Sequence, residues 1–211
     1  MIGRVAGPLT RRPNDAGEST LGDVVADAIQ VGTETWGGNV AALISPTELH
    51  YDLPPFPCPN PAPGPVEITL EDALRALPLR QSLITISLTG ADLCAALEQQ
   101  FDNPHPGRHT ILQVSHGLRY RWDPTAPPGR RVDPASVTIN GTPVVATTDY
   151  RVTISTFLWA GGDGFRAFSN GTPIPSAPLT GQHLDLLAAY LGRYQVVPLP
   201  TLDRITRTVG S

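Results

Sequence analysis

The stretch SLITISLTGADLCAALEQQF, residues 82–101, carries the clearest structural signal in this sequence. Residues 82–88 alternate with a period of two, which is typical of a β-strand with one buried face. The segment 89–92 (TGAD) then has the composition of a helix N-cap. Beyond it, the residues that would share one helix face are Leu93, Ala96, Leu97 and Gln100 or Phe101. The stretch therefore predicts a strand followed directly by a helix.

Toward the N-terminus, apolar periodicity predicts more elements of both kinds. Ser19 supplies a hydroxyl cap, and the residues after it at helical spacing are Leu21, Val24, Val25, Ala28 and Ile29. Residues 40–44 (VAALI) are a short apolar run between turn residues, which predicts a buried strand. Thr69 is expected to cap a short helix that Pro78 ends, because the residue before proline avoids the α region. Residues 53–65 hold seven prolines in thirteen positions, which predicts a stiff surface loop.

The second half of the chain is richer in strand signals. Further strands are expected at residues 111–115, 118–122 and 150–156. Asn140-Gly141 is a strong hairpin-turn signal within the apolar run 137–145, and residues 184–191 predict a last apolar helix. Strands in mixed order with helices of about ten residues favour an α+β fold, with mixed, largely antiparallel sheets packed against helices. We expect residues 1–211 to form a single domain.

The overall composition narrows the set of partners. At this length a single domain buries roughly 70% of the surface that its unfolded chain exposes, which is enough for a core without staples. The chain has 15 basic residues, all arginine, and 19 acidic residues, so its formal net charge is −4. Neutralising phosphates requires clustered positive charge, and the sequence has no basic run. We therefore expect neither nucleic acid nor a membrane surface as a partner.

Targeting signals and cysteines bear on the location of the protein and on disulfide or zinc sites. The N-terminus lacks a basic segment followed by an apolar stretch of about 7–15 residues, and no window approaches about 18 apolar residues. The chain as written is therefore expected in the cytoplasm, or outside the cell or in the periplasm if it was excised from a secreted parent. Cys58 and Cys94 are too few for a disulfide framework or for the repeated spacing of a zinc site.

The segment FLWAGGDGF, residues 157–165, has the composition of a ligand site. Phe157 stands six residues before Asp163, and we expect both where a strand passes into a loop. Gly161 and Gly162 would let a ligand approach the backbone closely. An aromatic face can stack on a planar heterocycle, while a carboxylate accepts hydrogen bonds from vicinal hydroxyls, so the pair could hold a nucleoside. From the residue types alone, a packed Phe beside a turn Asp is the plainer interpretation.

Several short motifs in one order resemble the C-terminal domain of the 5'-nucleotidases, a family that includes UDP-sugar hydrolases and cyclic phosphodiesterases. Over roughly residues 2–170 these are 17–23 (GESTLGD), 26–28 (ADA), 42–44 (ALI), 77–79 (LPL), 88–90 (LTG), 112–115 (LQVS) and 161–165 (GGDGF). The resemblance implies the fold of that domain and a nucleotide pocket that clamps the base between two aromatic rings. By position, Phe157 is similar to one of these aromatics and Asp163 to the carboxylate that engages the ribose. Hydrolysis in this family belongs to a separate N-terminal dimetal phosphoesterase domain.

The sequence departs from the family pattern at three places. Leu79 stands where the second stacking aromatic follows Leu-Pro. Residues 45–50 (SPTELH) replace the family's Asn-x-Gly-Gly-Ile-Arg, so that Ser45 opens the segment and His50 takes the place of a phosphate-facing arginine. Asp15 stands where the resemblance implies another arginine, although Arg11 and Arg12 are close. Arginine binds phosphate bidentately and histidine does not, so weakened phosphate binding is expected.

Other candidate groups carry weaker signals. His105 and His109 would offer two imidazoles without a third ligand, in a loop that contains prolines, so we expect no metal and no cofactor. Ser115 and His116 would point to opposite faces of a strand, which argues against a nucleophile and base pair. The set Glu48, His50, Tyr51 and Asp52 could perform acid and base chemistry, or it could be a decayed binding loop.

Two functions follow from these observations. The first is a nucleotide- or nucleoside-binding, substrate-specificity domain that takes part in hydrolysis only with a metallophosphatase domain supplied elsewhere, because this chain lacks the dimetal ligands. Its expected binding residues are Phe157, Asp163, Gly161, Gly162, Leu79, His50 and Ser45. The alternative is a stand-alone domain acting as an enzyme or accessory protein on a non-phosphorylated substrate, with His50 and Asp163 facing each other as catalytic groups.

Overall fold

The computed structural model describes residues 1–36, 38, 40–55, 64–101, 107–174 and 182–208. It confirms the strand and helix expected from residues 82–101. Strand β4 runs over Leu83–Thr89 and helix α3 over Gly90–Glu98. The Thr89 hydroxyl caps the helix by accepting from the backbone N–H of Asp92 at 3.1 Å. The residues that α3 buries are Gly90, Leu93, Ala96 and Leu97.

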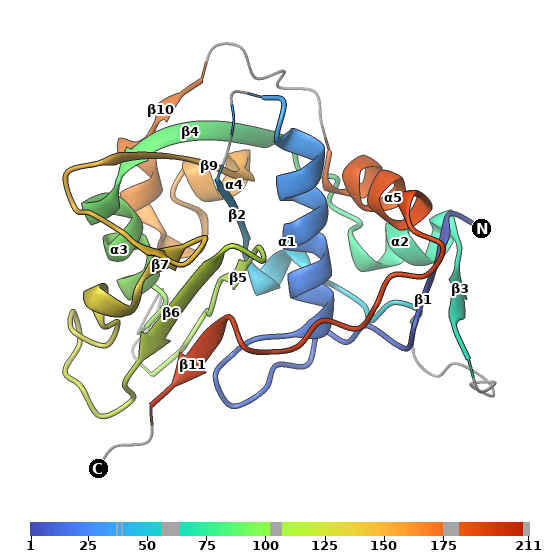
Figure 1. Ribbon diagram of the computed structural model, residues 1–211, viewed down its shortest axis with the longest axis horizontal. Helices are drawn as coiled ribbons and strands as arrows, with labels where there is room; N and C mark the ends of the chain where they lie inside the picture. The colour runs from blue at the N-terminus through green and yellow to red at the C-terminus, as the bar shows by residue number, and fades with distance from the viewer. Residues whose placement is uncertain (37, 39, 56–63, 102–106, 175–181, 209–211) are drawn as a thin grey trace.

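A five-stranded sheet forms the centre of the molecule (Figure 1). Its strand order is β10 (Thr172–Pro173), β4, β9 (Asp149–Ser155), β2 (Ala41–Ile44) and β5 (Gln113–Val114). Strands β2 and β9 pair in parallel, and the other neighbours are antiparallel. The sheet therefore has the mixed, largely antiparallel character expected from the sequence.

Both faces of the central sheet are buried. Ala42 and Ile44 of β2 pack into one core cluster, and Ala41 and Leu43 pack into the other. The helices that contribute to the first cluster are α1 (Thr20–Thr33), α2 (Leu70–Ala76) and α5 (His183–Arg193). The second cluster includes residues of α3 and of strands β4, β5 and β9. Burial on both faces explains why β2 is an uninterrupted apolar run rather than an alternating one.

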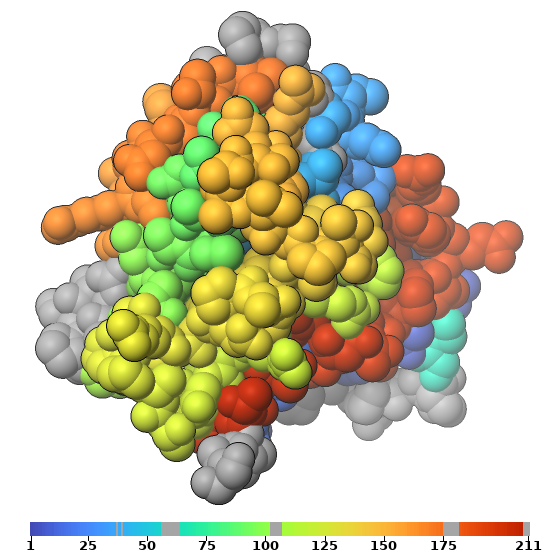
Figure 2. Space-filling model, turned by 60° about the vertical axis from the view of Figure 1, so that its left-hand side comes forward, coloured from blue at the N-terminus to red at the C-terminus, as the bar shows by residue number. Residues whose placement is uncertain are grey.

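A four-stranded sheet covers the second cluster, in the order β11 (Ile205–Arg207), β6 (Leu118–Trp122), β7 (Thr138–Ile139) and β8 (Thr142–Pro143). The expected Asn140-Gly141 hairpin joins β7 and β8, and both turn residues have positive φ, 50° and 77°. Figure 2 shows the yellow and gold segments after β6 lying against green α3. In agreement, Gly90 and Ala91 donate backbone hydrogen bonds to Thr148 and Ala146.

The structure adds short elements that periodicity did not predict. They are β1 (Gly3–Val5), β3 (Val66–Ile68), α4 (Thr156–Trp159), β10, β11 and the 3-10 turns η1 (Pro46–Glu48), η2 (Pro134–Ser136), η3 (Gly162–Gly164) and η4 (Arg166–Asn170). Residues 56–63 of the predicted proline-rich loop, with Cys58, lie outside the described residues, as does His105. None of the described helices is long and apolar enough to span a bilayer. The fold is α+β, as expected.

A buried charge cluster fastens the C-terminal segment to α1. The Arg204 guanidinium donates to both carboxylate oxygens of Asp27 at 2.8 Å. The Glu18 carboxylate accepts from the backbone N–H groups of Arg204 and Ile205 at 3.1 and 3.2 Å. Strand β11 begins at this anchor and pairs in parallel with β6. The charge cluster, rather than any strand periodicity, therefore sets where β11 joins the fold.

Candidate functional site

Phe157 lies in the first turn of α4, directly after β9. The Ser155 hydroxyl is the N-cap of this helix and accepts from the backbone N–H of Leu158 at 3.2 Å. Phe157 is half-buried and packs against the core cluster around α3. The expectation that Phe157 stands where a strand passes into a loop was therefore wrong in one respect, because a four-residue helix intervenes.

The glycine-rich turn after α4 is closed by backbone conformations that favour glycine. Gly161 and Gly164 have φ values of 85° and 84°. Asp163 also lies in the left-handed region, with φ 52°. Gly162 lies against the ring of Phe157, and a Cβ atom there would come within 2.5 Å of the ring carbons. The turn therefore packs its backbone closely against the ring of Phe157.

Two hydroxyl groups hold the carboxylate of Asp163. Its Oδ2 accepts from the Ser45 Oγ and from the Thr47 Oγ1, each at 2.5 Å. Ser45 directly follows β2, and Asp163 belongs to η3. These hydrogen bonds therefore join the turn after β2 to the turn after α4. Within the described part of the chain, no donor reaches Oδ1 of Asp163. Residues 161–164 of this turn, Asp163 included, are partly exposed.

Glu48 lies behind this arrangement and is buried. The backbone N–H of Ser45 and the hydroxyl of Ser155 both donate to Glu48 Oε1, at 3.3 and 3.1 Å. Its Oε2 lies 3.7 Å from Nδ1 of His183 in α5. Burial raises the pKa of Glu48 to about 7 and lowers the pKa of His183 to about 4. Near neutral pH, therefore, the imidazole is uncharged while the carboxyl group can take either form.

Three residues of this site were missed in the sequence: Thr47, Ser155 and His183. The turn that contains Thr47 did have a signal in the sequence. Ser45 and Glu48 form the Ser-x-x-Glu pattern of a capping box, which η1 adopts. Ser155 also follows a recognised pattern, a hydroxyl residue at the end of a strand. His183 had no local signal, since it lies far along the chain from Glu48, its contact in the fold.

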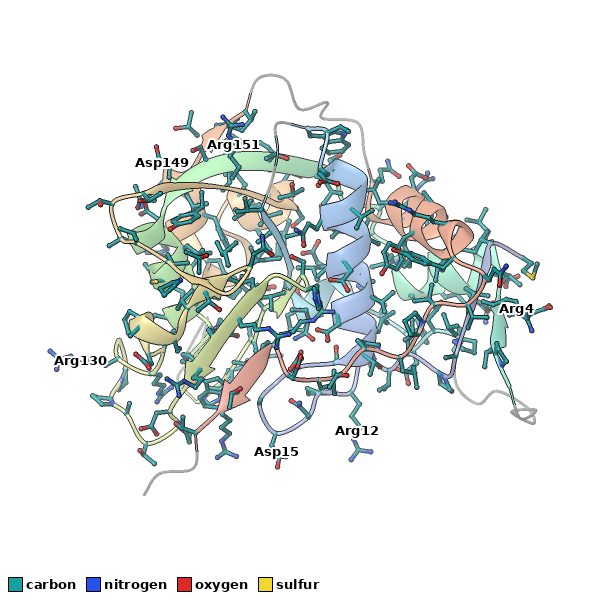
Figure 3. All side chains as sticks on the ribbon, viewed as in Figure 1. Arg4, Arg12, Asp15, Arg130, Asp149 and Arg151 are labelled. Carbon is teal, nitrogen blue, oxygen red and sulfur yellow. The ribbon has the colours of Figure 1, made fainter. Side chains whose placement is uncertain are left out.

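A cavity of about 310 Å³ opens beside the 45–48 turn. Its lining includes Arg11, Asn14, Pro46, His109 and Trp122. The Arg11 guanidinium reaches the backbone carbonyl of Leu49 at 3.5 Å. Arg12 instead projects from the outer edge of the loop before α1, whereas Asp15 of the same loop also lines the cavity (Figure 3). Of the two neighbouring arginines considered in the sequence, Arg11 is therefore the one beside the site.

The residues of the set Glu48, His50, Tyr51 and Asp52 differ in exposure and in hydrogen-bond partners. Asp52 accepts from the backbone N–H of Arg11 at 2.8 Å. Tyr51 is 56% exposed. The backbone N–H of His50 donates to Ala76, and its Nε2 is buried with no described partner. Their hydrogen-bond partners differ, and a shared role in acid and base chemistry stays a prediction.

The remaining candidates are placed as follows. Leu79, at the position of the second stacking residue, is 55% exposed. Between the described side chains of His50 and Asp163 the structure has no hydrogen bond, and their pairing as catalytic groups stays a prediction. Ser115 is buried and its hydroxyl accepts from Ala42, whereas His116 is exposed. Both residues lie beyond β5, which ends at Val114.

Metal ligands do not gather in the described residues: no group of three His, Cys, Asp or Glu side chains there could hold an ion. His109 is exposed and its ring lies edge-on to Phe101 and Trp122, at centroid distances of 5.4 and 5.9 Å. The thiol of Cys94 is half-buried, and burial raises its pKa. These groups are parts of the packing around α3 in this structure.

Fold and site together define an α+β domain with a glycine-rich aspartate turn beside a helix-borne aromatic ring. The model of one family, the 5'-nucleotidase C-terminal domain, matches residues 1–170. The chain belongs to this family. The extent of the match confirms the resemblance found in the sequence motifs.

Individual relatives agree with this assignment. Cell wall protein Lmo0130 of Listeria monocytogenes is 34% identical over 170 residues, which cover 80% of this chain and 20% of that protein. The trifunctional nucleotide phosphoesterase protein YfkN of Bacillus subtilis is 35% identical over 109 residues, 50% of this chain and 7% of that protein. A 5'-nucleotidase precursor from Thermus thermophilus superimposes with a TM-score of 0.78 at 26% identity, over 100% of this chain and 40% of that structure. The chain thus spans about a fifth of Lmo0130 and less than half of the Thermus protein.

Proposed function

We propose that this domain binds a nucleoside or nucleotide through Phe157 and Asp163. The observation that carries the proposal is the position of Asp163, whose carboxylate is fixed by Ser45 and Thr47 through Oδ2 and has Oδ1 left for a ligand. A vicinal diol could donate to Oδ1 with little cost of ordering, because the carboxylate is already held. The half-buried ring of Phe157 offers a face to the base in the same region.

The proposed pocket recognises sugar and base better than phosphate. The described residues around the 45–48 turn include two acids, Glu48 and Asp163, and the guanidinium of Arg11 there is directed to the backbone carbonyl of Leu49. His50 replaces the arginine that the family pattern places at the end of this segment. We expect adenosine and AMP to bind with similar affinities, because the phosphate gains little without a bidentate arginine.

Isothermal titration calorimetry with adenosine and AMP tests the proposal. Phe157→Ala should weaken adenosine binding roughly tenfold through loss of stacking, and Asp163→Asn should do so through loss of a charged acceptor. Asp149→Asn, an exposed aspartate on β9, serves as the control and should bind as the wild type does. Unchanged affinity in both site variants would contradict the proposal, and a strong preference for AMP would contradict the interpretation of His50.

The wider role that we propose is substrate binding for a metallophosphatase domain. Proteins that this chain covers only in part are named as a nucleotide phosphoesterase and as a 5'-nucleotidase precursor, and the described residues of this chain bring no group of three metal ligands together. By itself the domain would bind without hydrolysing phosphate. The relative named as a cell wall protein supports a location outside the cytoplasm for such an assembly.

A further inference from the structure

Glu48 occupies an unusual place for a carboxylate, since its side chain is only 2% exposed and it stands between two halves of the candidate site. It belongs to η1, the turn that follows β2, and its partners come from β9 and α5. The carboxylate is therefore buried beside the ligand site that we propose.

Glu48 is connected through one serine to Asp163 and through another to the helix that carries Phe157. Its Oε1 accepts from the backbone N–H of Ser45, and the Ser45 hydroxyl donates to Asp163. The same oxygen accepts from the hydroxyl of Ser155, which caps the helix that carries Phe157. A single buried oxygen thus links the turn that fixes Asp163 to the start of α4.

The other oxygen of Glu48 has no hydrogen-bond partner in the described structure. Oε2 is buried and faces Nδ1 of His183, whose Nε2 is also buried without a partner among the described residues. In the same part of the chain, the titratable groups that face Glu48 are His183 from α5 and Asp163 from η3. Oε2 can therefore take up a proton beside the neutral imidazole of His183. The two hydrogen bonds to Oε1 can remain in place when it does.

We propose that Glu48 is the positioning residue of the ligand site and that its ionised form holds the Asp163 turn and the Phe157 helix in the binding arrangement. This inference rests on the proposed function, because it names the group that regulates the same site. Hydrogen bonds to a charged acceptor are roughly twice as strong as neutral ones, so ionised Glu48 grips Ser45 and Ser155 more firmly. Its negative charge also favours hydroxyl donors at Asp163.

Ligand affinity is therefore expected to fall as Glu48 takes up a proton. Burial raises the pKa of this carboxyl group to about 7, so the change falls between roughly pH 8 and pH 6. Burial keeps the pKa of His183 at about 4, so this imidazole stays neutral across the same interval. We expect adenosine to bind wild-type protein roughly 3- to 10-fold more weakly at about pH 6 than at about pH 8.

Amide hydrogen exchange without ligand tests the positioning role by itself. The reporters are the backbone N–H groups of Thr47 and Leu158, which donate to Ser45 Oγ and Ser155 Oγ. Glu48→Ala should raise exchange at both amides roughly tenfold, and Glu48→Gln should fall between Glu48→Ala and the wild type, because its neutral amide oxygen still accepts but does so more weakly than a carboxylate. Glu98→Ala is the matched control, because Glu98 accepts from the amides of Arg131 and Val132 elsewhere. It should change exchange there and not at Thr47 or Leu158.

Calorimetry with adenosine at the same two pH values then tests the ionisation. Glu48→Gln cannot ionise, so its affinity should be equal at both and close to that of the wild type at the lower pH. A Glu48→Gln variant with the pH dependence of the wild type, or unchanged exchange in Glu48→Ala, would overturn the inference. If wild-type protein fails to bind adenosine at either pH, the proposed function fails, whereas the exchange experiment still decides whether Glu48 positions the site.

Discussion

At the scale of single residues, the site depends on one close contact and one fixed carboxylate. Gly162 allows the backbone to lie against the ring of Phe157, and Asp163 takes up a left-handed conformation in which Ser45 and Thr47 reach its Oδ2. A side chain at position 162 would occupy the space of the ring. The glycine therefore sets the distance between the aromatic face and the aspartate turn.

Gly162→Ala should disturb ligand binding more than folding. The new Cβ would meet the Phe157 ring at 2.5 Å, so the half-buried ring must move, and we expect adenosine affinity to fall roughly tenfold. Gly192→Ala in α5 is the control, because its Cβ would meet its nearest neighbour at 3.4 Å. Calorimetry and a thermal melt of both variants make the comparison. Wild-type affinity in Gly162→Ala would show that the Phe157 ring has no part in binding.

At the scale of elements, the sequence predicted the helices and strands that are long enough to show an apolar pattern. It missed the short elements, which depend on contacts with the rest of the fold. The strand in 82–88 and the buried run 40–44 carry periodic or continuous apolar signals, and both are present as β4 and β2. Helix α4 has four residues, too few to show a helical period, so Phe157 was expected beside a loop. Short strands such as β11 lack alternation altogether.

The same distinction explains which parts of the candidate site were foreseen. Phe157 and Asp163 were found because they belong to one contiguous segment whose motif resembles a family. Ser155 and His183 contact Glu48, and nothing local to either residue indicates that partner. Glu48 itself was grouped with its neighbours in sequence, whereas the turn η1 directs it inward to β9 and α5. Side-chain direction in a three-residue turn is set by tertiary packing, which one sequence does not display.

At the scale of the whole molecule, the C-terminal segment beyond the family match is tied into the domain by charge. Arg204 is nearly buried and lies against Asp27 and Asp23, the latter at 3.4 Å, and burial raises the pKa of Asp23. Helix α5 and strand β11 both follow residue 170, where the match ends. These segments complete the two core clusters, since Leu187 and Leu191 pack in one and Ile205 in the other.

Arg204→Ala should cost much of the stability of the fold. Removing one partner of a buried ion pair leaves uncompensated carboxylates, and we expect a loss of about 3–5 kcal/mol in the free energy of unfolding. Arg119→Ala breaks the pair with Asp203, whose side chains are 38% and 52% exposed, and should cost no more than about 1 kcal/mol. Urea denaturation of the two variants measures both. Equal small losses would show that the Arg204 cluster does not hold the C-terminal segment in place.

The central claim is that Asp163 accepts hydrogen bonds from the vicinal hydroxyls of a ligand that stacks on Phe157. The most direct test is the ratio of wild-type affinities for adenosine and 2'-deoxyadenosine, which share the base and differ in one hydroxyl group. We predict that adenosine binds roughly tenfold more tightly, because the deoxy compound withdraws a donor from a charged acceptor. Equal affinities for the two nucleosides would contradict the account.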